Sequence, residues 1–193
     1  FGTILAGSIS VPLSFRLLPE ELPFRINHSE CAVICFSRNT LSQVVAALPD
    51  FENKELTFVC LDEPDDSIRS AFNEHGVEPG KRFFSFYDLV EEGKKLLPDY
   101  EKILDGIAED ADENDTVTIS YTSGTTGNPK GIMLTNRNYY VNSQDSVTMF
   151  RVPSTYRTLI VLPCDHSFAH TVGIFAALHR GITLYFVDAR NGT

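Results

Sequence analysis

The sequence lacks three features that would have placed it in a well-defined class of protein. No apolar run approaches the ~18 residues of a membrane-spanning helix. No two cysteines have the C-x-x-C spacing of a zinc or redox site. Basic residues are few, with 16 Lys and Arg against 26 Asp and Glu and a net charge of −10. A nucleic-acid-binding surface needs a basic face, so this composition argues against such a partner.

The cysteines and the ends of the chain suggest where the protein works and what it is part of. We expect the four cysteines to be buried and reduced, which favours a cytoplasmic protein; they are Cys31, Cys35, Cys60 and Cys164. No signal peptide is visible. The chain opens on Phe1 in the middle of an apolar pattern and stops soon after another. We therefore expect it to be a piece of a longer protein.

Apolar runs alternate with helical patterns along the first two thirds of the chain. Strand-like runs occur at residues 8–13, 31–36, 56–61, 83–86 and 116–121. Between them, apolar residues at helical spacing predict helices that begin near residues 21, 40, 67 and 85. This alternation predicts an α/β fold with a mostly parallel sheet and flanking helices.

The last third of the chain repeats the pattern after a break. A helix predicted from Asn136 to about residue 150 is followed by a connector at 151–156. A strand at 158–162, a helix at 170–179 and a strand at 183–187 come next. We therefore expect two subdomains: residues 1–150, and an incomplete second unit at 156–193. The second is so apolar that we expect it to self-associate or to be disordered.

Residues 121–131 form the most informative stretch, with the sequence YTSGTTGNPKG. Glycines let the backbone turn sharply and bring its N–H groups close to a ligand. Hydroxyl groups donate hydrogen bonds to phosphate oxygens, and Lys130 adds a positive charge. The same residue types also occur in ordinary turns. The order does not fit G-x-x-x-x-G-K-[ST] or G-x-G-x-x-G, so spacing alone predicts a phosphate-binding loop of unspecified class.

This loop resembles the signature loop of the adenylate-forming (AMP-binding) enzyme superfamily. That superfamily includes acyl-CoA synthetases, luciferases and the adenylation domains of peptide synthetases. Short sequence segments around the loop are most similar to those of long-chain fatty acid–CoA ligases. They lie at residues 11–13, 19–22, 26–30, 131–136 and 162–168. The resemblance covers most of the chain. It implies the first sheet of an acyl-CoA synthetase-like N-terminal domain plus the start of a second sheet.

The resemblance also implies a reaction in two steps. A fatty acid carboxylate attacks the α-phosphate of ATP, which gives an acyl-adenylate and pyrophosphate, and coenzyme A then displaces AMP. Magnesium is implied, with Thr122 as a ligand. Lys130 would neutralise charge in the first step, so we assign it a catalytic role. The residues that we assign to ATP are Thr122, Ser123, Gly124, Thr125, Thr126, Gly127 and Lys130.

A second family motif, Leu-Pro-x-x-His-x-Phe, matches residues 162–168. By resemblance, His166 and Phe168 lie beside the acyl and adenylate pocket, with His166 also catalytic. Many acyl-CoA ligases have Glu three residues after this histidine, whereas Ala169 stands here. Two other interpretations of these residues stay open. In one, Phe168 is a core residue and His166 is a turn residue; in the other, His166 and His170 hold zinc, although no third ligand is evident.

Two other functions stay open beside the fatty acid–CoA ligase. One is an adenylation enzyme with a different acceptor, such as a carrier protein, or an oxidative enzyme like luciferase. The other is a non-catalytic nucleotide-binding or interaction module on the same fold. The expected partners are small molecules, namely fatty acid, ATP and coenzyme A. Peripheral membrane contact of the longer enzyme is left open.

Overall fold

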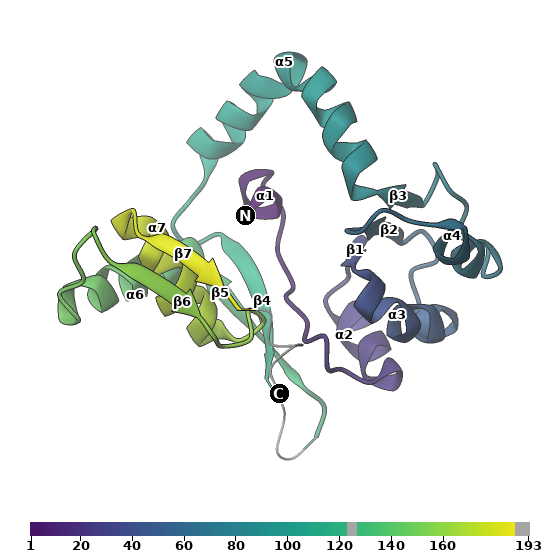
Figure 1. Ribbon diagram of the computed structural model, residues 1–193, viewed down its shortest axis with the longest axis horizontal. Coiled ribbons are helices and arrows are strands. Elements are labelled where there is room, and N and C mark those ends of the chain that lie inside the picture. The colour runs from purple at the N-terminus through teal and green to yellow at the C-terminus, as the bar shows by residue number, and fades with distance from the viewer. Residues whose placement is uncertain (123–126, 188–193) are drawn as a thin grey trace. The chain divides into compact units, whose positions relative to one another are not determined.

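The computed structural model describes residues 1–122 and 127–187, and these form two compact units (Figure 1). One unit comprises Phe1–Ser14 and Ile107–Thr193, and the other comprises Phe15–Gly106. The division into subdomains at residues 150 and 156 stays a prediction. No helix in the described ranges is both long and apolar enough to cross a membrane.

The unit Phe15–Gly106 is built on a three-stranded sheet whose strands are all parallel. The strands are β1 (Val33–Phe36), β2 (Thr57–Cys60) and β3 (Phe83–Ser85), in that spatial order. The connecting helices are α3 (Leu41–Ala47) and α4 (Asp66–Asn73), and α2 (Leu22–His28) precedes β1. Short 3-10 turns η1 (Pro19–Glu21), η2 (Arg38–Thr40) and η3 (Leu48–Asp50) flank the helices. The predicted parallel α/β arrangement is confirmed here.

Four phenylalanine rings form the centre of this unit. Phe72 of α4 lies with its ring centroid 5.0 Å from that of Phe36, 5.1 Å from Phe58 and 5.0 Å from Phe83. These three partners come one from each strand of the sheet. Phe58 and Phe83 are direct neighbours in the parallel register of β2 and β3. Ring packing of this kind adds to the burial of apolar area and fixes α4 over the sheet.

A 25-residue helix, α5 (Phe86–Asp110), follows β3 and is more extended than the sequence pattern predicted. It contains Pro98, which has no N–H to donate to the preceding turn. None of its residues is buried. The apolar face expected from Leu89, Leu96 and Leu97 is therefore exposed, by 40%, 42% and 50%.

The unit with both ends of the chain is centred on a hairpin, and here one expectation was wrong. The strand at 116–121, expected in the parallel sheet, is β4 (Thr116–Thr122); it pairs antiparallel with β5 (Lys130–Thr135) and forms one parallel bridge, between Thr118 and Ser10. The strand expected at 8–13 is reduced to one bridge, in which Ser10 donates to the Val117 carbonyl (2.9 Å). Pro12 has no N–H for a longer ladder.

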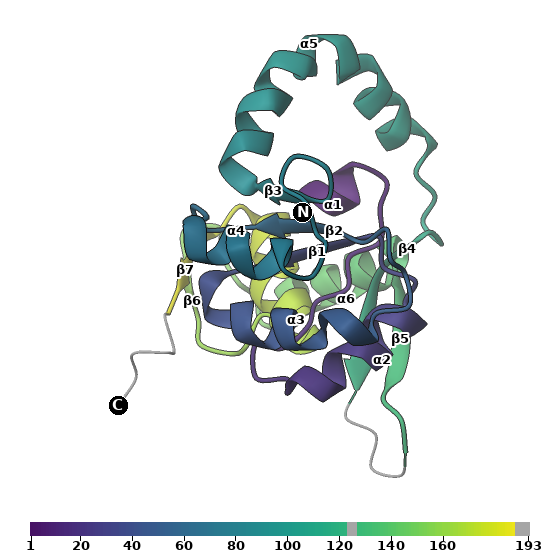
Figure 2. The same cartoon turned by 90° about the vertical axis from the view of Figure 1, so that its right-hand side faces the viewer.

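Helices pack against this hairpin and a second small sheet. The helix α6 (Asn136–Met149) contacts the π-helix η4 (Ala169–Phe175) and α7 (Ala176–Arg180), as Figure 1 and Figure 2 show. Thr135, not Asn136, caps α6: its hydroxyl accepts from the Asn138 N–H. The strands β6 (Arg157–Ile160) and β7 (Thr183–Phe186) pair in parallel, and a short α1 (Gly2–Leu5) opens the chain.

Candidate functional site

The loop end of the β4–β5 hairpin carries two of the predicted phosphate ligands. Thr122 and Lys130 are direct partners in the antiparallel register, and both are exposed. Residues directly opposite in an antiparallel pair project their side chains to the same face. The side chains that carry the hydroxyl and the ammonium group therefore project from neighbouring positions on the same face of the hairpin. The four loop residues Ser123, Gly124, Thr125 and Thr126 lie outside the described residues.

Two glycines at this end have measurable constraints. Gly127 has a φ of 156°, in a range that side-chain-bearing residues rarely adopt, and no atom lies within 4 Å of where its Cβ would be. Gly131 is tighter, because a Cβ there would lie 3.0 Å from Cγ2 of Ile119 and 3.4 Å from the ring of Tyr121. The first glycine has open space at its Cβ position, and the second leaves room for the Ile119 and Tyr121 side chains of β4.

The hairpin face that bears Thr122 and Lys130 continues inward as a row of buried polar groups. Ser120 is 9% exposed and Thr118 is 2% exposed. The Tyr139 hydroxyl of α6 lies near Thr118 without a hydrogen bond of normal geometry, and burial raises the pKa of this tyrosine. The Tyr139 ring stacks on Phe175 with centroids 4.3 Å apart. These contacts join the hairpin, α6 and η4 into one support for the loop.

A groove of about 390 Å³ lies beside the inner end of this face. Its walls come from β5, α6 and the segment before and within η4. They are lined by both polar and apolar side chains: Leu134, Asn138, Tyr139, Asn142, Ser146, Ser167, Phe168, Thr171 and Val172. The groove thus includes Phe168, one of the two residues predicted beside the acyl pocket. Its size suits part of a small organic ligand.

His166 stands next to the groove and does not line it. Its Nδ1 accepts a hydrogen bond from the Phe168 N–H at 3.2 Å, so the imidazole is tied to the turn that holds Phe168. His166 is exposed, whereas His170 is half-buried and burial lowers its pKa. No cluster of three metal-ligating side chains occurs in residues 1–122 and 127–187, so the zinc reading gains no support there.

The two groups of predicted site residues occupy different ends of β5. Lys130 begins the strand at the loop, and Leu134, four residues on, borders the groove with Phe168. At a rise of about 3.4 Å per residue, roughly 14 Å separates these positions. The roles that we assign to Thr122, Gly127, Lys130, His166 and Phe168 stay predictions.

The wall contributed by α6 was missed by sequence reasoning. Asn138, Asn142 and Ser146 recur every four residues and therefore share one face of the helix. Asn142 donates to the Asn138 carbonyl (2.7 Å), and Ser146 donates to the Asn142 carbonyl (2.6 Å). A polar stripe at this spacing was a visible signal, but it equally suits a solvated helix face.

Comparisons with known proteins assign the chain to a family. The family model "AMP-binding enzyme" matches residues 1–192. The 4-hydroxybutyrate–CoA ligase 2 of Metallosphaera sedula is 28% identical over 168 residues, which cover 86% of this chain and 28% of that protein. The long-chain-fatty-acid–CoA ligase ACSBG2 of Homo sapiens is 25% identical over 195 residues, which cover 100% of this chain and 27% of that protein.

A solved structure has the same fold. The adenylation domain AlmE of Vibrio cholerae, in complex with glycyl-adenosine-5'-phosphate, superposes with a TM-score of 0.69 at 19% identity, covering 97% of this chain and 33% of that one. The chain thus spans only about a quarter to a third of the length of these proteins. The loop, the fold and the match over nearly every residue lead to one conclusion: this chain belongs to the AMP-binding enzyme family.

Proposed function

We propose that the chain supplies part of the ATP site of an enzyme that activates a fatty acid as acyl-adenylate and transfers it to coenzyme A. The observation that carries the proposal is the pairing of Thr122 with Lys130 at the loop end of the hairpin. This pairing sets a hydroxyl donor and a cation on one face at the base of a glycine-rich loop. The family of the chain supplies the reaction class.

The residues at the loop end of the hairpin have the chemistry that the first step needs. A carboxylate that approaches a polyphosphate is repelled unless the negative charge is neutralised. Lys130 places a positive charge there, and the backbone of the loop would add N–H donors. Holding the leaving pyrophosphate in line would lower the barrier mainly by positioning. The side chains of Thr122 and Lys130 are exposed at the loop end of the hairpin, and thus accessible to a polyphosphate.

Thr122 fits the magnesium ion that such a reaction implies. Mg²⁺ prefers oxygen ligands and is commonly bound by one or two protein groups together with substrate phosphates and water. Thr122 offers one exposed hydroxyl oxygen, and residues 1–122 and 127–187 contain no carboxylate cluster that would form a separate all-protein site. The ion, when bound, would offset phosphate charge beside Lys130.

The groove beside Phe168 is the proposed location of the substrate's acyl part. Phe168, Leu134 and Val172 give it an apolar surface, and the hairpin face that leads to it ends at Thr122 and Lys130. His166, hydrogen-bonded to the Phe168 N–H, would border the carboxylate. Fatty acids and coenzyme A are named by the human relative, whereas the Metallosphaera relative names 4-hydroxybutyrate, so the acid needs a direct test.

Pyrophosphate exchange into ATP, measured with the full-length protein, tests the proposal. We expect exchange that depends on a fatty acid, followed by thioester formation when coenzyme A is added. Exchange with hydroxybutyrate but no fatty acid would replace the proposed substrate and keep the reaction. Transfer to a carrier protein alone would replace the acceptor. ATP binding without exchange for any acid would overturn the enzymatic proposal in favour of a nucleotide-binding module.

A further inference from the structure

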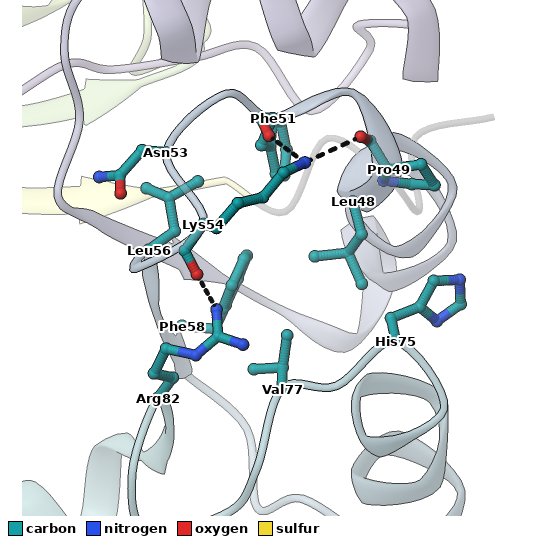
Figure 3. Close-up of a pocket in the computed structure, with 10 residues that line it drawn as sticks. All are labelled: Leu48, Pro49, Phe51, Asn53, Lys54, Leu56, Phe58, His75, Val77 and Arg82. Atoms are coloured by element: carbon teal, nitrogen blue, oxygen red, sulfur yellow. Dashed lines mark hydrogen bonds between the residues drawn. The ribbon is translucent and has the colours of Figure 1, made fainter.

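A second cavity lies wholly within the unit Phe15–Gly106, at the amino ends of β2 and β3 (Figure 3). Its volume is about 270 Å³. Its floor is apolar and almost fully buried: Leu56 and Phe58 are each 1% exposed, and Val77 is 3% exposed. Figure 3 shows the side chains of Leu48 and Val77 pointing toward each other across the cavity. Nothing in the proposed reaction uses this cavity.

Two cations, Lys54 and Arg82, line the cavity beside its apolar floor. The Lys54 ammonium donates to the carbonyls of Pro49 (3.1 Å) and Phe51 (2.6 Å). The Arg82 guanidinium donates to the carbonyls of Lys54 and Gly76. A lysine has three donors and an arginine has five, so each side chain keeps donors beyond those bonds. The carbonyl bonds hold both cations at the rim.

Among the described residues, no carboxylate is ion-paired with either of these cations. Other basic side chains do form ion pairs with carboxylates, and these include Arg38 with Asp65 and Lys81 with Glu78. Within the described ranges, no Asp or Glu lines the cavity, although Glu78, which is paired with Lys81, lies close enough to Arg82 to interact with it electrostatically. In a chain with a net charge of −10, two such cations beside an apolar cavity are complementary to an anion.

We propose that this cavity is a second ligand site, which binds a small carboxylic acid as its carboxylate. The carboxylate accepts hydrogen bonds from Lys54 and Arg82, and an aryl or short aliphatic body lies between Leu48 and Val77. Charge-assisted bonds of this kind are stronger than neutral ones. The volume is near the lower end for small-molecule pockets, about 300 Å³, which excludes a long chain.

Methyl NMR on the full-length protein, with benzoate as the probe, tests this site. We expect saturable shifts of the Leu48 and Val77 methyl signals. Lys54→Met should weaken benzoate binding by about tenfold, since it removes one charge-assisted bond. Lys81→Met is the matched control, because Lys81 is 72% exposed, pairs with Glu78 and does not line the cavity. It should leave benzoate binding unchanged.

Three results would overturn the proposal. Benzoate that leaves both methyl signals unshifted at millimolar concentration means that no such site exists. Equal weakening by Lys54→Met and Lys81→Met means that only the overall charge matters. Inorganic phosphate that shifts the same methyl signals as strongly as benzoate means that the cavity is a general anion site and does not recognise the apolar body. A folded spectrum of Lys54→Met without ligand shows that its effect is on binding.

Discussion

Thr122 and Lys130 are cross-strand neighbours at the last pair of the β4–β5 ladder, immediately before the glycine-rich loop. This arrangement gives the ladder a function beyond holding the hairpin together. It sets the two side chains on one face with about 4.5–5.5 Å between their Cβ atoms, so that a hydroxyl and an ammonium group start from neighbouring positions.

Replacing Lys130 should slow adenylation in the full-length protein. Lys130→Ala removes one charge-assisted contact to phosphate, a loss of about 1.5–3 kcal/mol, or roughly 10- to 150-fold in rate if it is felt only in the transition state. Pyrophosphate exchange measures this directly. Lys95→Ala is the control, because Lys95 is exposed and paired with Glu92. Unchanged exchange in Lys130→Ala would remove the role that we give this residue.

Gly127 should tolerate no β-branched side chain if the nucleotide passes beside it. Its φ of 156° is strained for valine, but open space surrounds the Cβ position, so Gly127→Val should still fold. We expect loss of pyrophosphate exchange with a nearly unchanged melting temperature. Gly93→Val, on the exposed helix α5, is a control that should keep activity. A fully active Gly127→Val variant would show that the backbone does not approach ATP.

Gly131 should be needed for the packing of the hairpin. A Cβ at this position meets Cγ2 of Ile119 at 3.0 Å, so Gly131→Ala should displace the Ile119 side chain and lower stability by about 1–3 kcal/mol. Chemical denaturation of the 193-residue chain measures this change. The double variant Gly131→Ala, Ile119→Ala should lose less than the sum of the two single losses. Additive losses would place the strain elsewhere.

The sequence predicted the parallel sheet well because its strands are continuously apolar and its connections are helical. It could not predict that β4 pairs with β5, since the short apolar run after the loop has the same composition in a hairpin or a parallel strand. Pro12 argued against a full strand at 8–13, because proline has no N–H to donate, and the apolar periodicity alone did not show this. The loop was visible from its residues. The α6 wall of the groove needs three-dimensional structure, because Asn138, Asn142 and Ser146 equally suit a helix face in water.

Asp65 should make stability depend on pH in the acid range. The pKa of Asp65 is held well below its usual value by hydrogen bonds from Ser67, from Arg38 and from the Ile68 N–H. A carboxyl group whose pKa is lowered by folding stabilises the folded state at pH values above its unfolded pKa, about 3.9. This stabilisation is lost as the pH falls through the pKa of the folded state. Asp65→Asn should therefore be less stable at neutral pH, and the difference should narrow below about pH 4.

Denaturation curves at several pH values, with Asp99→Asn as the control for loss of one negative charge, measure this effect. Asp99 lies on the exposed helix α5. A constant difference between wild type and Asp65→Asn across the acid range would contradict the assignment, because the hydrogen bonds at Asp65 would then not couple folding to its ionisation.

The sheet formed by β6 and β7 should make the 193-residue chain self-associate. Leu159 and Tyr185 are register partners, lie on the same face and are 58% and 48% exposed; Val161 is 63% exposed. Contiguous apolar area of this kind favours association, and each strand has an edge with no other described strand beside it. Leu159→Lys should shift the chain toward monomer in sedimentation velocity, because it adds a charge to the centre of that face. Met149→Lys changes another exposed apolar residue, at the end of α6, and should leave association unchanged. A monomeric wild-type chain at high concentration would mean that this face has no affinity for a second copy.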